Sequence, residues 1–173
     1  MKNSILLIIL LLSLLFSCNK KDENIKSINL DNILSEKAVK ILAGSTLTVS
    51  FPFCDMVPLK QWDQIILISP YMNFRKLKEN DLKNIENVIK IFEENALSED
   101  RCALLFLWKK TIIAYAIPKR LPIDFLGLVV NNNKNIDSFL KEDCGDFYLK
   151  KEIYKNEKRL LVRIKTNEVF NPL

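Results

Sequence analysis

The chain has 173 residues, with 26 Lys and Arg against 21 Asp and Glu, a formal net charge of +5 and no histidine. The lack of histidine excludes Ser-His-Asp and Cys-His nucleophile systems and zinc sites built on imidazole. The basic residues are spread along the chain without a block interleaved with aromatic residues, so we expect no nucleic-acid partner. The three glycines form no phosphate-cradling loop, and we expect no cofactor, no metal site and no catalytic residue.

The amino-terminal residues have the pattern of a secretory signal. Lys2 precedes an apolar segment over residues 5–16, and Ser17 and Cys18 follow it. The segment is shorter than the roughly 20 apolar residues that span a bilayer. An ordinary signal peptide is the alternative, but it does not explain a cysteine at the cut. The run Leu15-Phe16-Ser17-Cys18 resembles the lipobox of bacterial lipoproteins.

That resemblance implies cleavage before Cys18, diacylglycerol on its sulfur and attachment of the protein to a membrane. We therefore expect a signal peptide over residues 1–17, the lipidated cysteine and a flexible tether over residues 18–29, and a single domain over residues 30–173. Asn19 is not the aspartate associated with inner-membrane retention, so the outer membrane is the expected location. Residues 20–23, Lys-Lys-Asp-Glu, resemble a surface-export signal, with a plain solvated tether as the alternative.

The pattern of the first half of the domain predicts a helix, two strands and a second helix, in that order. Apolar residues at helical spacing predict a helix over residues 31–43, capped by Asp31 and ending at Gly44. Alternation over residues 46–53 predicts a half-buried strand whose apolar side includes Leu47. Residues 65–68 are apolar on both faces and predict a central strand. The strongest helical pattern covers residues 81–96, with Asn80 or Asp81 as its cap.

The pattern of the second half of the domain predicts mainly β-hairpins. Residues 103–108 and 111–117 predict one hairpin, although Lys109-Lys110 is not a favoured two-residue turn and a longer loop is the alternative. Residues 125–130 fit a strand or a helical turn. Residues 147–153 and 160–164 predict a second hairpin that turns at residues 155–157. Together these segments predict an α+β fold, a mostly antiparallel sheet of five or six strands packed by two or three helices.

Three cysteines remain besides Cys18, and none lies in a C-x-x-C motif. An exported protein can form disulfides. We favour a bridge between Cys54 and Cys144, because both flank turn signals. Cys102 opens an apolar strand and fits the role of a small buried hydrophobe.

Several polar and aromatic residues fall at predicted strand ends. Trp62-Asp63 precedes the strand at 65–68, Pro70-Tyr71 follows it, and a later strand pair leads through Pro118-Lys119-Arg120 to Asp124-Phe125. Over residues 62–125 this pattern resembles a family of small, largely uncharacterised bacterial exported proteins, which implies a shared fold and no activity.

The strand-end residues are the candidate partner-binding set: Trp62, Asp63, Tyr71, Arg120 and Asp124. We expect Asp63 and Asp124 each to pair with Arg120, and exposed Trp62 or Tyr71 to mark a binding face. The alternative is that these residues have a structural role where strands meet loops: they hydrogen-bond to the loops and fix the point at which each strand begins.

Three functional hypotheses follow. The first is a non-enzymatic, lipid-anchored protein-binding module, such as an immunity protein, an inhibitor or an accessory of an envelope assembly. The second is a carrier of a small ligand or lipid, with a pocket between helix and sheet. The third is a hydrolase that uses two carboxylates from the acidic turns at residues 99–100 and 142–146. The loop setting of those acids favours ordinary solvated turns.

Overall fold

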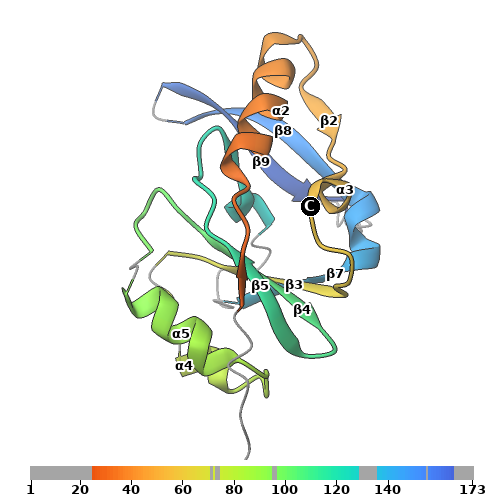
Figure 1. Cartoon of the computed structure of the whole chain (residues 1–173). Helices are drawn as coiled ribbons and strands as arrows, with labels where there is room; N and C mark the ends of the chain where they lie inside the picture. Colours follow the sequence, from red (N-terminus) through yellow and green to blue (C-terminus); the bar gives the residue numbers. More distant parts are fainter. Residues whose placement is uncertain are drawn as a thin grey trace, which may run out of the picture.

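The computed structural model describes residues 25–70, 72, 75–94, 97–128, 136–154 and 156–165. The fold is α+β, as predicted, but its strands form two sheets instead of one (Figure 1). The first sheet has the strand order β1 (Lys26–Ser27), β5 (Thr111–Ala116), β4 (Ala103–Trp108), β3 (Gln64–Ile68) and β7 (Ile136–Leu140). The second sheet has the order β2 (Thr48–Ser50), β8 (Phe147–Tyr154), β9 (Glu157–Ile164) and β6 (Ile123–Asp124).

Among the described strands, most pairs are antiparallel and two are parallel. β1 runs parallel to β5, and β6 runs parallel to β9. Alternating patterns identify strands and their faces, but they do not say which strands pair across the long connections. The alternating pattern could therefore not predict that the strands divide into two mixed sheets.

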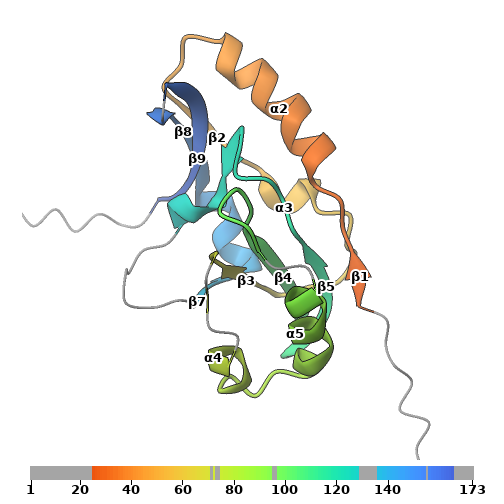
Figure 2. The ribbon, with the colours of Figure 1, turned by 90° about the vertical axis from the view of Figure 1, so that its left-hand side faces the viewer.

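The first sheet is covered on both faces, and α2 (Asp31–Ala43) packs on β9 and β6 of the second sheet. α2 and the second sheet enclose one apolar core, which contains Trp62, Phe106 and Phe125. α5 (Ile85–Glu94) and the short α4 (Arg75–Lys78) enclose a second core on the opposite face, around Phe92. Figure 2 shows α2 at one end of the molecule and α4 and α5 at the other. The strand predicted over residues 65–68 is central and buried, and it needs this cover on both sides.

The strongest predicted helix begins four residues later than expected. Asp81 and Asn84 have positive φ angles of 50° and 65°, which a right-handed helix does not allow. Lys83, between them, donates from its backbone N to Lys110 O at 3.0 Å and accepts from Ile112 N at 3.2 Å. Residues 81–84 therefore pack against β5 and do not form part of α5. Residues 95–96 at the far end of the prediction lie outside the described residues.

α2 has the predicted bounds, and Leu34 and Ala38 on its apolar face are buried. Its cap differs from the prediction, because the Asp31 carboxylate accepts a hydrogen bond from Lys119 N at 2.9 Å. The helix does end at Gly44, whose backbone N donates to Ile41 O.

The strand predicted over residues 46–53 shortens to β2. Phe53 begins the short helix α3 (Phe53–Met56), and Phe51 is buried as expected. Leu47, which we expected to be buried, is 71% exposed. The strand β7 was not predicted.

Both predicted hairpins form. Lys109 and Lys110 make the tight turn between β4 and β5 with φ angles of 47° and 63°, so the longer loop is not needed. β8 and β9 pair over their full lengths, from Phe147 opposite Ile164 to Tyr154 opposite Glu157. The segment at 125–130 begins as the 3₁₀ helix η1 (Phe125–Leu128), and a second one, η2 (Lys141–Asp146), links β7 to β8.

The folded part begins before residue 30. Lys26 and Ser27, which we placed in the tether, form β1 at the edge of the first sheet, opposite Ala114 and Tyr115. Ile28 is buried, and its backbone N donates to Tyr115 O at 2.8 Å. Cys18 and the signal segment lie outside the described residues.

Candidate functional site

Asp124 is the buried charged residue of the described part of the chain, with 1% of its surface exposed. It ends β6, next to β9. Arg120 donates to its carboxylate from Nε at 3.2 Å and from Nη2 at 3.0 Å. Arg159 on β9 donates from Nη1 at 3.1 Å, and the backbone N of Leu126 donates at 3.0 Å. Two guanidinium groups therefore compensate one buried carboxylate.

The cleft beside Asp124 has a volume of about 430 Å³. Both acidic and basic side chains line it, together with one leucine: Glu99, Asp100, Lys119, Arg120, Leu121, Asp124, Glu157 and Arg159. The charge pattern continues along the outer face of the second sheet, where Arg159 Nη2 lies 3.6 Å from Glu152 and Arg163 Nη2 lies 3.9 Å from Glu152. Carboxylates and guanidinium groups therefore alternate along this face.

This arrangement holds strands together. The Asp124 carboxylate receives charge-assisted hydrogen bonds from two arginines that come from different parts of the chain. Arg120 also donates from Nη1 to the carbonyl oxygen of Glu99 at 2.7 Å, so it ties β6 to the loop before β4. The predicted Arg120–Asp124 pair is therefore present as a structural clamp.

Trp62 and Asp63 lie directly before β3 and have structural roles. Trp62 is 2% exposed, packs edge-to-face on Phe106 with ring centroids 5.8 Å apart, and has Lys141 Nζ 5.0 Å from its ring centroid. It therefore cannot present a binding face, contrary to one of our hypotheses. Asp63 Oδ2 accepts from Lys109 N at 2.9 Å and so holds the β4–β5 turn. The predicted pairing of Asp63 with Arg120 is wrong, and Tyr71 lies outside the described residues.

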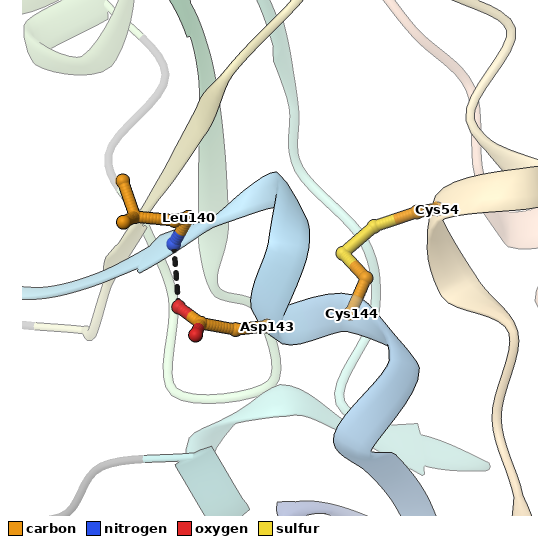
Figure 3. The surroundings of a disulfide bond; sticks show 4 residues. All are labelled: Cys54, Leu140, Asp143 and Cys144. Atoms are coloured by element: carbon orange, nitrogen blue, oxygen red, sulfur yellow. Dashed lines mark hydrogen bonds between the residues drawn. A yellow bond between two sulfur atoms is a disulfide. The ribbon is translucent and has the colours of Figure 1, made fainter.

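Cys54 and Cys144 form a disulfide, the pairing that the sequence favoured (Figure 3). Their Cα atoms are 5.9 Å apart, and the bond joins α3 to η2 across a sequence separation of 90 residues. In η2, the Asp143 carboxylate accepts from Leu140 N at 2.7 Å and fixes the start of this turn.

The remaining described cysteine, Cys102, is buried and free. Burial raises the pKa of its thiol from 9.0 to about 12, and the nearby Asp124 carboxylate acts in the same direction. The thiolate is the reactive form of cysteine. Cys102 therefore stays a neutral, unreactive part of the core, as we expected.

The acidic turns serve local structure. The Ser98 hydroxyl donates to Asp100 and lowers the pKa of that exposed carboxyl group below 3.8. Asp146 accepts through its backbone oxygen from Lys165 N. Within the described ranges, no group of three or more His, Cys, Asp or Glu side chains is placed to hold a metal ion.

A second cleft, of about 530 Å³, lies where α5 meets the edge of the first sheet near β1. Ile91, Tyr115 and Ile117 contribute apolar surface, whereas Asn29, Asp31, Ser98 and Arg101 contribute polar surface. This mixed lining is not that of a lipid cavity, which is mostly apolar.

The sequence did not point to Arg159, although it is central to the clamp. Alternation in β9 places Arg159 and Arg163 on one face, but the link to Asp124 depends on the parallel pairing of β6 with β9. No family model, curated protein or solved structure matches this chain. Among the described residues, no helix combines the length and the apolar character needed to cross a lipid bilayer.

Proposed function

We propose that this chain is a lipid-anchored protein of the bacterial cell envelope whose folded domain binds another protein. In this proposal Cys18 carries the lipid, the outer membrane is the location, and the domain has no enzymatic activity. The sequence supports the anchor through the lipobox-like run that ends at Cys18. An immunity protein, an inhibitor and an accessory of an envelope assembly are all forms of the same role.

The disulfide supports export of the domain. Disulfides persist in the periplasm and on cell surfaces, and they are rare in the bacterial cytosol. The Cys54–Cys144 bridge joins two segments that are far apart in the chain, so it stabilises the domain as a whole.

The observation that carries protein binding is a pair of exposed apolar side chains on the second sheet. Leu47 is 71% exposed and Ile153 is 76% exposed. Lys151 N donates to Leu47 O at 2.9 Å, so Leu47 lies beside β8 two residues from Ile153. Alternation along β8 places Ile153 on the same face as Lys151. Exposed apolar side chains that lie together on one face of a sheet are typical of an interaction surface.

The anchor is tested at Cys18. We expect the mature chain to begin at this residue and to carry acyl chains, which mass spectrometry of the amino-terminal peptide detects directly. The Cys18→Ala chain should lose both the acyl mass and its fractionation with membranes. An unmodified Cys18 in the wild-type chain would refute the anchor.

Protein binding is tested by crosslinking and affinity capture of the lipidated protein from its own envelope, with Cys18→Ala as the control. One stoichiometric protein partner, weakened in the control, is the expected result. A co-purifying lipid or small molecule without a protein partner would favour the carrier hypothesis instead.

A further inference from the structure

The exposed apolar side chains belong to a face that can be defined by strand register. Ile153 on β8 lies opposite Lys158 on β9, and Lys151 lies opposite Leu160. Leu47 lies beside Lys151 through the backbone hydrogen bond already described. We call Leu47, Lys151, Ile153 and Lys158 the hairpin face.

The hairpin face continues the core-forming side of the second sheet. Leu149 and Leu160 point to the same side as Ile153 and are fully buried. Towards the turn of the hairpin the sheet extends past its cover, and Figure 1 shows the β8–β9 tip projecting beyond α2. The side chains near the tip are therefore oriented like core residues but are open to solvent.

Alternation sorts the charges of this hairpin by side. Glu152 and Glu157 point to the outer face, where Glu152 lies 3.6 Å from Arg159. Lys151 and Lys158 share the hairpin face with Ile153. By register, none of the described β2, β8 and β9 residues on this face is acidic. The face therefore combines apolar contact area with positive charge.

From this geometry we propose that the hairpin face docks a partner protein that presents an apolar side chain flanked by carboxylates. The proposal rests on the proposed function and specifies the chemistry of the partner. Lys151 Nζ already donates to the carbonyl oxygen of Gly44, whereas Lys158 is exposed. A partner carboxylate near Lys158 adds charge complementarity to apolar burial, which directs the partner to this face and raises its association rate.

The charge pattern argues against a second copy of this chain as the occupant. A twofold contact places the same patch of each subunit against the other, so lysines would face lysines. The fold argues against the anchoring membrane as the occupant. β1, where the tether joins the domain, and the β8–β9 tip lie on opposite sides of the molecule in Figure 2.

The test begins with a photo-reactive benzoylphenylalanine at position 153 of the full lipidated chain, crosslinked in its own envelope. Position 140 is the control site, because Leu140 is also exposed but lies on β7 of the first sheet. We expect one protein adduct from position 153 and none from position 140, with the crosslinked partner peptide containing Asp or Glu beside an apolar residue. An adduct to a second copy of the chain or to lipid would overturn the proposal.

The captured partner is then purified and titrated against variants of the full chain in detergent micelles. We expect Ile153→Gln and Lys158→Glu each to weaken binding at least tenfold, and Leu140→Gln to change it less than twofold. The Lys158→Glu defect should be relieved when the crosslinked partner carboxylate is changed to Lys. Circular dichroism melts of the variants should match the wild type, because all three positions are exposed.

The two proposals fail in different ways. If a partner is captured but Ile153→Gln, Lys158→Glu and Leu140→Gln all bind it like the wild type, the hairpin face is wrong and protein binding stands. If no partner is captured from any position or by whole-protein crosslinking, the proposed function itself is wrong.

Discussion

Replacement of Asp124 by Asn is the sharpest test of the clamp. The amide keeps the shape of the side chain but removes the charge that holds Arg120 and Arg159. Breaking a buried ion pair by changing one partner costs roughly 3–5 kcal/mol. The arginine side chains keep 23% and 14% exposure, and each retains another acceptor, Glu99 O and Glu152 respectively. We therefore expect a loss at the low end of that range, about 3 kcal/mol of unfolding free energy.

The assay is urea unfolding with a shared m-value, which keeps the comparison to stability alone. Asp63→Asn is the matched control, because Asp63 accepts one hydrogen bond from Lys109 N and should cost about 1 kcal/mol. The triple change Arg120→Met, Asp124→Leu and Arg159→Met should recover most of the loss, since apolar replacements remove the uncompensated charges. If Asp124→Asn is as stable as Asp63→Asn, the clamp interpretation is refuted. Loss of partner capture in an equally stable Asp124→Asn chain would make the carboxylate a functional group.

Three further predictions concern the disulfide, the buried thiol and one glycine. Changing both Cys54 and Cys144 to Ser opens a crosslink across 90 residues and should cost roughly 4–5 kcal/mol in urea unfolding; a loss below about 1 kcal/mol would contradict a structural role. Cys102 should not react with Ellman's reagent in the folded protein at pH 8 and should react fully in denaturant. Because its pKa is raised from 9.0 to about 12, its contribution to stability is present below pH 9 and lost as the pH rises towards 12, and Cys102→Ala should lack that component of the pH dependence. A Cβ at Gly127 would meet Val162 O at 2.4 Å, so Gly127→Ala should cost about 1–3 kcal/mol in urea unfolding, whereas Gly145→Ala, with nothing within 4 Å, should be near neutral in the same assay.

Local patterns predicted the elements well where one physical signal dominated. The helix at 31–43, the central strand at 65–68 and the two hairpins follow from apolar periodicity, which reports the buried face directly. The start of α5 was predicted wrongly because Asp81 and Asn84 adopt positive φ angles while Lys83 pairs with the β4–β5 turn. That interaction is between segments distant in sequence, so helical spacing carries no trace of it.

The candidate site was predictable in part. The Arg120–Asp124 pair lies four residues apart and was found, whereas Arg159 reaches Asp124 only through the β6–β9 pairing. Trp62 fits either a core or an interface in a sequence, and its burial depends on packing against Phe106. Leu47 alternates correctly with Val49, but the cover on that side of the sheet ends before it. Periodicity gives the direction of a side chain, and tertiary structure decides whether anything lies there.

The position of β1 has a mechanical consequence. Two residues, Lys26 and Ser27, pair with β5 at the edge of the first sheet, and they are the first part of the fold after the amino-terminal segment. Tension applied at the amino terminus acts on this short edge strand before it reaches α2. Peeling β1 away would release about 7 Å of chain, at roughly 3.3 Å per residue for Lys26 and Ser27. We therefore expect β1 to separate first under such tension, before the part of the fold that the disulfide links.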